Sequence, residues 1–503
     1  MPLAQSRIST RRKRRLALAT TVALLAVVIG GAEGTAPAET AQTKPNVVLV
    51  MTDDQTVEQM RSLERVRRLL GGAGTTFTQS FSTFPLCCPS RATYLTGQYS
   101  HNHGVRGNNP PKGGFYRLDS SNTLPVWLRD AGYATAHIGK YLNRYGERDP
   151  RQVPAGWGEW YGSVDPTTYG FFDYCLNENG RLVAYGRDSE LARACPRARR
   201  RGRAYQADVY SRKAVDYINR RAPSNRPFFL SVGYLAPHDG GQNDGPRRCR
   251  GSAKPAPRHQ GRFADARLPR PSGFNERDVS DKPESIRRLS RLSSGQVAKI
   301  RTAYQCRRES LLAVDEGVGA MVDALRRKGE LAKTVFIFTS DNGFFQGEHR
   351  VNRGKVRAYE PSVRVPILMR GPGVPRDKRV SELTANVDLA ATIVDAADAT
   401  PGKRPDGVSL LDLARRPSRF SGRDILLENP LGYRGIVPRY AGIRTRRYKY
   451  VEYGRGEREL YDLRSDRFEE RSKHDSPRYA NTRRRLAGEL RRLRDCSGAA
   501  CRR

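Results

Sequence analysis

The sequence predicts an α/β fold with a mostly parallel central sheet, because apolar runs that resemble strands alternate with helical segments. Residues 47–51 and 335–338 are continuous, β-branched and apolar, and residues 227–235 form a third such run. A run without polar alternation is typical of a strand buried on both faces of a parallel sheet. Between the runs, segments such as residues 309–329 place apolar residues at helical spacing. Strands that alternate with helices favour a parallel sheet flanked by helices.

The C-terminal part of the chain has a different pattern. Residues 440–453 and 457–466 alternate in polarity and predict short strands joined by turns. Residues 476–494 predict a terminal basic helix. We therefore expect an α/β domain over residues 44–400 and a smaller α+β domain with an antiparallel sheet over residues 401–503.

The chain is strongly basic, with 90 Lys and Arg against 52 Asp and Glu and a net charge of +38. Such a surface attracts polyanions, although a general arginine bias would give the same composition. The sequence contains no zinc finger or aromatic-rich RNA-binding motif, so we expect no nucleic-acid partner. Residues 247–283 are rich in Pro, Arg and Gly and predict a long, basic surface loop.

The N-terminus has the pattern of an export signal. Basic residues at 11–15 precede an apolar stretch at 16–31, and small residues around Ala36 and Ala38 offer a cleavage site. We expect a secretory signal peptide over residues 1–38 and a secreted or cell-envelope protein; an uncleaved anchor is the alternative. The apolar stretch is short for a bilayer, so no stable membrane span is expected.

Export to an oxidising compartment would allow disulfides among the eight cysteines. Pairing by proximity in the sequence is a guess, because connectivity does not follow from spacing. The guessed pairs are Cys175 with Cys195, Cys249 with Cys306, and Cys496 with Cys501. This pairing leaves the adjacent residues Cys87 and Cys88 without partners.

Polar side chains follow the predicted strands. Asp53 and Asp54 come after the first strand, Asp341 and Asn342 after the strand at 335–338, and His238 after the third. Ligands of open α/β sheets bind at the carboxyl ends of the strands. Carboxylate and amide oxygens suit Ca²⁺ or Mg²⁺ rather than zinc, so together these residues predict a hard-cation site. Each pair alone would more often be a turn or a helix cap.

The cysteine pair stands directly before a predicted helix. Pro89 suits a first helical turn, which places Cys87 at the helix N-terminus, where backbone N–H groups favour an anion. Arg91 adds a fork of donors for a tetrahedral oxyanion. Without the residues that follow, two ordinary buried thiols would be the preferred interpretation. Lys140 and Lys355 each follow a glycine in a segment that resembles a loop, a pattern shared by many surface lysines.

The segment from Cys87 to Gly97 reads C-C-P-S-R-A-T-Y-L-T-G. It resembles the signature of the type I, formylglycine-dependent sulfatases, C-x-P-S-R-x-x-x-L-T-G, at every fixed position. Further matching segments are VVLVMTDDQ, GKYLN, APH, SDNG, GPG, NVDLAATIVDAA and ELYDL, so the resemblance covers roughly residues 44–471. The details look closest to the N-acetylglucosamine-6-sulfatase branch. The resemblance implies an alkaline-phosphatase-like α/β fold.

The resemblance also implies roles for individual residues. Cys87 would be oxidised to Cα-formylglycine by a formylglycine-generating enzyme during export, and its hydrate would attack the ester sulfur. Ca²⁺, with Mg²⁺ less favoured, would be held by Asp53, Asp54, Asp341, Asn342 and the modified Cys87. The other matching positions are Arg91, which holds the formylglycine, Lys140, which contacts the diol and sulfate, His238, which contacts sulfate or assists the leaving oxygen, and Lys355, which binds sulfate.

One position departs from the family pattern. Many sulfatases carry a histidine two residues after the first lysine, where this chain has Leu142. The usual candidate base for expelling sulfate is therefore missing. His101 or His103 could replace it, although a structural role for both is an equal alternative.

The sequence thus predicts an exported sulfatase acting on sulfate monoesters of a sugar or an aryl alcohol. The positive charge and the basic loop favour a polyanionic sulfated glycan. A phosphonate or phosphate ester hydrolase of the same superfamily is one alternative, because the site suits any tetrahedral oxyanion. A basic glycan-binding protein without catalysis is the other.

Overall fold

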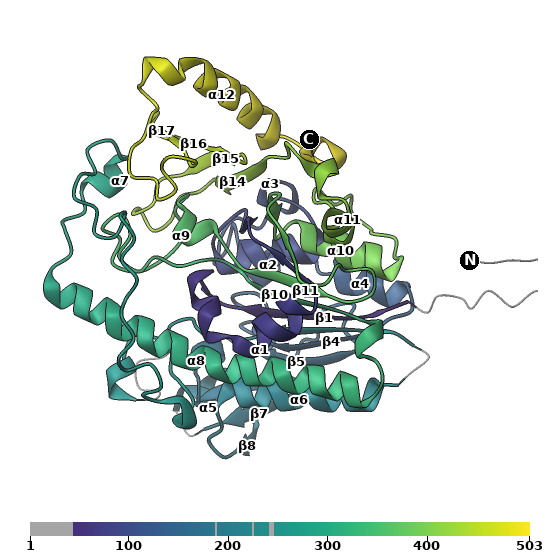
Figure 1. Ribbon diagram of the computed structural model, residues 1–503. Helices are drawn as coiled ribbons and strands as arrows, with labels where there is room; N and C mark the ends of the chain where they lie inside the picture. Colours follow the sequence, from purple (N-terminus) through teal and green to yellow (C-terminus); the bar gives the residue numbers. More distant parts are fainter. Residues whose placement is uncertain (1–43, 187–188, 224–225, 241–245, 503) are drawn as a thin grey trace, which may run out of the picture. The chain divides into compact units, whose positions relative to one another are not determined.

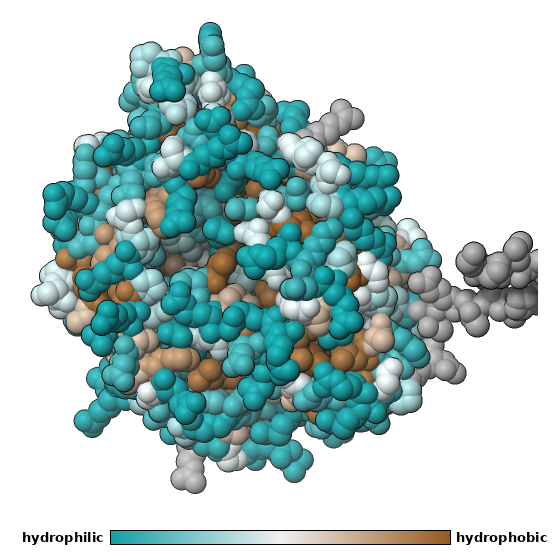
Figure 2. Space-filling model, viewed as in Figure 1, coloured by the Kyte–Doolittle hydropathy of each residue, from teal (hydrophilic) through white to brown (hydrophobic). Residues whose placement is uncertain are grey.

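The computed structural model describes residues 44–186, 189–223, 226–240 and 246–502 (Figure 1). The predicted signal peptide at residues 1–38 lies outside the described residues. Across the described part, no helix is both long enough and apolar enough to cross a membrane. The face shown in Figure 2 is mainly hydrophilic, with apolar residues in scattered patches.

A large mixed sheet forms the centre of the fold. Its described strands number 11, in the order β12-β2-β11-β10-β1-β9-β4-β5-β6-β7-β8. The middle five are parallel: β10 (Thr334–Ser340), β1 (Asn46–Thr52), β9 (Phe228–Gly233), β4 (Ala134–Gly139) and β5 (Glu159–Ser163). The outer strands are β12 (Lys378–Val380), β2 (Thr75–Phe77), β11 (Ile367–Arg370), β6 (Tyr174–Glu178), β7 (Arg181–Tyr185) and β8 (Arg199–Arg201). The predicted α/β class is confirmed, and the three predicted strands are neighbours in the sheet.

The sequence of β1 is apolar from Val47 to Met51 because both faces of the strand are covered. Val48 and Val50 belong to a core cluster with helices α6 (Gln206–Arg221) and α8 (Ser294–Arg327), which pack along one face (Figure 1). Val47 and Leu49 belong to a second cluster with α2 (Cys87–Thr96), α4 (Leu124–Asp130) and α10 (Asp388–Ala397). Side chains of a strand alternate between faces, so β1 contributes to two cores at once.

A second sheet of four antiparallel strands lies in the C-terminal part. Its order is β14 (Ile425–Asn429), β15 (Tyr440–Arg444), β16 (Tyr448–Tyr453) and β17 (Arg458–Asp462). The terminal basic helix α12 (Ala480–Arg494) packs on β15 and buries three leucines, Leu486, Leu490 and Leu493. In the stretch of chain between β12 and β14, α11 (Leu410–Arg415) packs on α10.

The three guessed disulfides, Cys175–Cys195, Cys249–Cys306 and Cys496–Cys501, are all present, and Cys87 and Cys88 are free and buried. The prediction of a surface loop at residues 247–283 is partly wrong. The segment is irregular, but Cys249 ties it to α8, and Ala253 and Ala256 are fully buried in the core beside that helix. Small apolar residues among the arginines and prolines explain how it packs.

A buried ion pair connects the large sheet's helices to the start of the small sheet. Arg423, which is 4% exposed, donates to both carboxylate oxygens of Asp388 at 2.7 and 2.8 Å. The same carboxylate accepts the backbone N–H groups of Ala385 and Val408. Removing one partner of a buried pair leaves an uncompensated charge, which is strongly destabilising.

We expect Arg423→Met to lower the free energy of unfolding by about 3–5 kcal/mol, because Asp388 would stay buried without its cation. The measurement is urea-induced unfolding followed by circular dichroism. Arg419→Met, at an exposed site in the same segment, is the matched control and should change stability by less than about 0.5 kcal/mol. Equal stabilities for the two variants would contradict this account of the connection.

Candidate active site

The carboxyl ends of four adjacent parallel strands carry the candidate site. Asp53 and Asp54 follow β1, Asp341 follows β10, His238 follows β9, and Lys140 follows β4. Ligand atoms of Asp53, Asp54, Cys87 and His238 all lie within 4.8 Å of one another. Residues that are far apart in the sequence therefore meet at one edge of the sheet.

Cys87 occupies the first position of α2, after Leu86 in extended conformation, and it is 1% exposed. Lys355 Nζ lies 2.9 Å from its Sγ, and Asp53 Oδ1 lies 3.5 Å from the same sulfur. Burial, together with the negative charge of Asp53, raises the pKa of the thiol to about 12. An unmodified Cys87 would therefore be a neutral thiol, which is a poor nucleophile.

Two adjacent carboxylates are compensated by cations from separate segments. Asp53 forms an ion pair with Lys140 and lies 3.8 Å from Arg91 Nη2. Asp54 forms an ion pair with Lys355 and lies 3.6 Å from His238 Nε2. Burial alone would raise the pKa of both carboxyl groups, but the surrounding positive charges hold the pKa of each below its usual value.

Arg91 is buried and contacts residues that follow three strands, β1, β10 and β4. Its Nε donates to Asp341 Oδ2 at 2.9 Å, and its Nη1 donates to the carbonyl oxygen of Lys140 at 2.7 Å. The side chain is 2% exposed. Because these bonds fix α2 against β10 and β4, Arg91 holds the helix that carries Cys87 in place.

The oxygen donors fit a hard divalent cation. Asp54 Oδ1 accepts from Asn342 Nδ2 at 2.6 Å, while the buried Oδ1 of Asn342 has no hydrogen-bond partner. An acceptor that is buried without a partner is costly unless something binds it. Asp53 and Asp54 add carboxylate oxygens beside it, and Asp341 lies on the same edge. A set of oxygens suits Ca²⁺ or Mg²⁺.

Tyr169 was not found by sequence reasoning, although it contacts two of the candidate residues. Its ring centroid lies 4.6 Å from Lys140 Nζ and 5.0 Å from the ring centroid of His238. On the other side of that ring, His238 Nδ1 lies 2.7 Å from the carbonyl oxygen of Asp239. The Nδ1–H therefore donates to this carbonyl, and Nε2 faces Asp54. No local motif marks Tyr169, because its role depends on tertiary placement alone.

Arg307 is the second residue that sequence reasoning missed. It lies on α8, is 1% exposed, and donates to the carbonyl oxygens of Asp54 and, at 2.9 Å, of Pro237. Its guanidinium also stacks on Phe344, 4.1 Å from the ring centroid. One side chain thus joins the loops that follow β1, β9 and β10. The helical pattern is the sequence feature that could have identified Arg307, because the residue falls on the buried face of α8.

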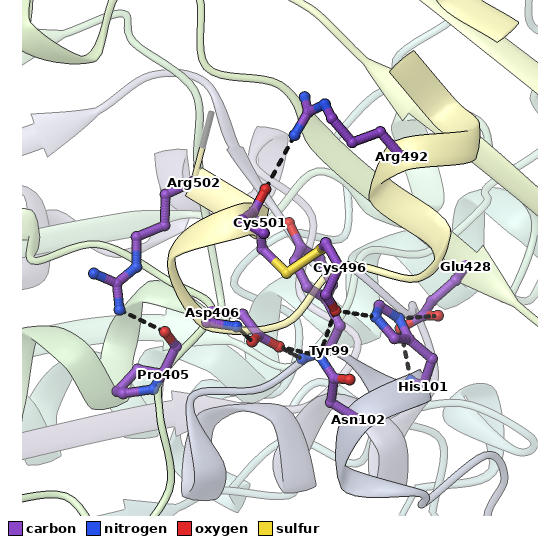
Figure 3. Close-up of a disulfide and its surroundings, with 12 residues drawn as sticks. Tyr99, His101, Asn102, Pro405, Asp406, Glu428, Arg492, Cys496, Cys501 and Arg502 are labelled. Carbon is purple, nitrogen blue, oxygen red and sulfur yellow. Dashed lines mark hydrogen bonds and ion pairs between the residues drawn. A yellow bond between two sulfur atoms is a disulfide. The ribbon is translucent and has the colours of Figure 1, made fainter. Parts of the chain in front are cut away.

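The suggested replacement of the missing histidine by His101 or His103 is not supported. His101 lies between Glu428, at 3.0 Å, and the carbonyl oxygen of Cys496, at 2.9 Å (Figure 3). His103 contacts Thr93 and the backbone N–H of Val105. Both nitrogens of each ring are therefore engaged away from the cluster, and the structural alternative holds. Leu142 is buried in the apolar core, 2% exposed.

The chain matches known protein families over most of its length. A family model described as Sulfatase matches residues 45–399, and one described as N-sulphoglucosamine sulphohydrolase, C-terminal, matches residues 347–496. Human N-acetylglucosamine-6-sulfatase is 33% identical over 440 residues, covering 85% of this chain and 75% of the relative. An arylsulfatase of Volvox carteri is 33% identical, covering 92% of this chain and 76% of the relative.

Other relatives are longer or more distant. A Caenorhabditis elegans protein named as a Sulf-1 homolog is 31% identical over 80% of this chain, which spans only 54% of that relative. A solved complex with the substrate D-glucosamine-2-N,6-O-disulfate shares the fold, with a TM-score of 0.73 and 23% identity over 89% of this chain and 97% of that one. A phosphonate monoester hydrolase of Agrobacterium radiobacter has a TM-score of 0.67 and 21% identity over 90% of this chain and 95% of that one. The family match extends over more than half of the chain, which therefore belongs to the sulfatase family of sulfuric ester hydrolases.

Proposed function

We propose that this chain is an exported sulfatase that hydrolyses sulfate monoesters. The substrate would be a sulfated sugar, such as N-acetylglucosamine-6-sulfate in a glycosaminoglycan, or an aryl sulfate. The observation that carries the proposal is the placement of Cys87, the first residue of C-x-P-S-R, at a helix N-terminus among Asp53 and Lys355. The resemblance to N-acetylglucosamine-6-sulfatases supports the choice of sugar.

Cys87 would carry Cα-formylglycine, whose hydrate supplies one hydroxyl as nucleophile and a second for product release. A formylglycine-generating enzyme acting during export would be the partner for this modification. Asp53, Asp54, Asp341 and Asn342, with the modified residue 87, would hold Ca²⁺, or less favourably Mg²⁺. The ion supplies positive charge next to the sulfate.

The side chains of the cluster have distinct tasks in this proposal. Lys140 and Lys355 place two ammonium groups around Cys87, which suits an anionic, tetrahedral group at the end of the helix. His238 keeps Nδ1–H bound to a backbone carbonyl, so its Nε2 faces the cluster. When the ring is doubly protonated, Nε2–H can pass a proton to the leaving oxygen, which leaves the neutral imidazole. Leu142 lies in the apolar core, and His238 supplies the imidazole of the cluster that also contains Asp53, Asp54 and Cys87.

The structure also suits other tetrahedral oxyanions, so a phosphonate or phosphate ester hydrolase is the second candidate. This candidate is supported by the fold that the chain shares with a phosphonate monoester hydrolase. Comparing kcat/KM for an aryl sulfate, an aryl phosphate and an aryl phosphonate ester decides between them. A larger value for the sulfate supports the proposal, and a larger value for either phosphorus ester would replace it.

The first test is mass spectrometry of the peptide that contains Cys87 and Cys88, taken from protein secreted by its natural host. We expect a loss of about 18 Da, or its hydrated form, at Cys87 only. Cys88 is the internal control and should be alkylated as an ordinary thiol. An alkylated Cys87 in the natural protein would remove the catalytic proposal and favour the glycan-binding alternative.

The second test is removal of the metal. At a Ca²⁺ concentration about 100 times the dissociation constant, binding should stabilise the fold by about 2.7 kcal/mol, and a chelator should reverse this gain. Asp54→Ala should abolish the Ca²⁺-dependent rise of the thermal midpoint. Asp130→Ala, at an exposed carboxylate, is the control and should keep it. A thermal midpoint and an activity that do not change with either Ca²⁺ or Mg²⁺ would contradict the proposed site.

The third test concerns Arg307. We expect Arg307→Met to lower kcat about 10²-fold, because Asp54 and His238 would lose their common support and shift relative to each other. Arg308→Met, next to it on α8 and bonded to Ser62 instead, should leave kcat within a few-fold of wild type. Ca²⁺ affinity should fall with Arg307→Met as well, which a loss of global stability alone would not cause. A folded Arg307→Met protein with normal kcat would refute the positioning role.

A further inference from the structure

The loop between β14 and β15, residues 430–439, has a closed and well-defined tip. Tyr433 and Val437 exchange backbone hydrogen bonds of 2.8 and 3.1 Å across it. Gly432, Arg434 and Gly435 all have positive φ, of 71°, 49° and 67°. A non-glycine residue rarely adopts this conformation, so the turn fixes the backbone at Arg434.

This loop lies beside the two residues closest to the chemistry. Tyr433 packs on a small apolar cluster of Phe84, Leu86 and Val356. Leu86 immediately precedes Cys87, and Val356 immediately follows Lys355. At the far end of the loop, Tyr440 donates its hydroxyl hydrogen bond to the carbonyl oxygen of Val356 at 2.8 Å. The loop is therefore fixed against the segments that carry Cys87 and Lys355.

The outward surface of the loop is unusual for this molecule. Leu431 is 49% exposed and Ile436 is 61% exposed, and these are two of the four large apolar residues that are exposed in the described part of the chain. A cavity of about 450 Å³ lies against the loop, which is within the size range of small-ligand sites. Exposed apolar side chains beside a cavity indicate a contact surface.

The loop also carries positive charge that the protein does not neutralise. Arg434 is exposed, and its guanidinium carbon lies 5.3 Å from the Tyr433 ring centroid. Within the described ranges, no carboxylate lies at ion-pair distance from Arg434. By contrast, Arg288 and Arg455, which line the cavity beside the loop, both pair with Glu284. An unpaired cation fixed over an aromatic ring is ready to bind an anion from outside.

We propose that residues 430–439 form a subsite for the sugar residue that neighbours the sulfate ester. The apolar face of the sugar ring would lie on Leu431 and Ile436, and an anionic substituent, sulfate or carboxylate, would bind Arg434. This inference rests on the proposed function, since it places a second part of a sulfated glycan next to Cys87. It assigns substrate selection to the small sheet and sulfate chemistry to the large one.

The test compares an anionic sulfated disaccharide with 4-nitrophenyl sulfate, which has no second sugar. Arg434→Asn removes the charge, and asparagine tolerates positive φ, so the turn can persist. The ratio of the two KM values, disaccharide over aryl sulfate, should rise about tenfold, as expected for the loss of a charge-assisted contact. Arg197→Asn is the matched control, because Arg197 is also exposed with positive φ, at 57°. It should leave the ratio unchanged.

Binding can be tested separately from turnover. In a Cys87→Ala background, isothermal titration of the disaccharide should show about tenfold weaker binding when Arg434→Asn is added. Repeating the titration with the carboxyl-reduced disaccharide identifies the anion. A loss of the difference between variants assigns a carboxylate, and a retained difference assigns a sulfate.

Two results would overturn the subsite. One is equal disaccharide binding with and without Arg434→Asn, and the other is a KM ratio that stays constant because both substrates are affected alike. Failure of the proposed function looks different. A wild-type protein carrying the modified Cys87 would then hydrolyse neither sulfate ester, while the titration would still report on the loop.

Discussion

The organisation of this protein depends on the burial of acidic side chains at the carboxyl edge of the large sheet. Asp53, Asp54 and Asp341 are between 0% and 2% exposed. Charges removed from water in this way are tolerated only when partners compensate them. The compensating side chains, Lys140, Lys355 and Arg91, come from distant segments, so the site can form only after the parallel strands have assembled.

Two buried arginines hold the loops that carry these acidic side chains. Arg91 and Arg307 are both buried, and both hold backbone carbonyl groups of the loops that carry the site. Arg91 acts from α2, on one face of the sheet, and Arg307 acts from α8, on the other. The strand-end loops are therefore clamped from two sides, which limits the shifts that would disturb a reaction needing fixed geometry.

Features that depend on neighbouring residues could be predicted from the sequence, whereas contacts between distant segments could not. Val47 to Met51 reveal a central strand because burial on both faces leaves no polar position, and Pro89 marks the start of a helix through its own backbone chemistry. The disulfide guesses held because each cysteine outside the adjacent pair bonds to its nearest unpaired neighbour along the chain, at separations of 20, 57 and 5 residues. By contrast, the contacts of Tyr169 and Arg307 join segments far apart in the chain, and nothing local encodes them. The prediction of a surface loop at residues 247–283 was partly wrong because it rested on the high Pro, Arg and Gly content. It gave too little weight to the few small apolar residues that pack in the core.

The structure gives the two adjacent cysteines different environments. Successive residues of a helix point about 100° apart, so Cys87 and Cys88 cannot face the same surroundings. Cys87 faces Asp53 and Lys355, whereas Cys88 belongs to the apolar core, and burial raises the pKa of its thiol to about 12. Its backbone N–H donates to Asn108, which fixes the helix start beside it. Cys88 therefore supports the first turn through packing, and the polar cluster is reached by Cys87 alone.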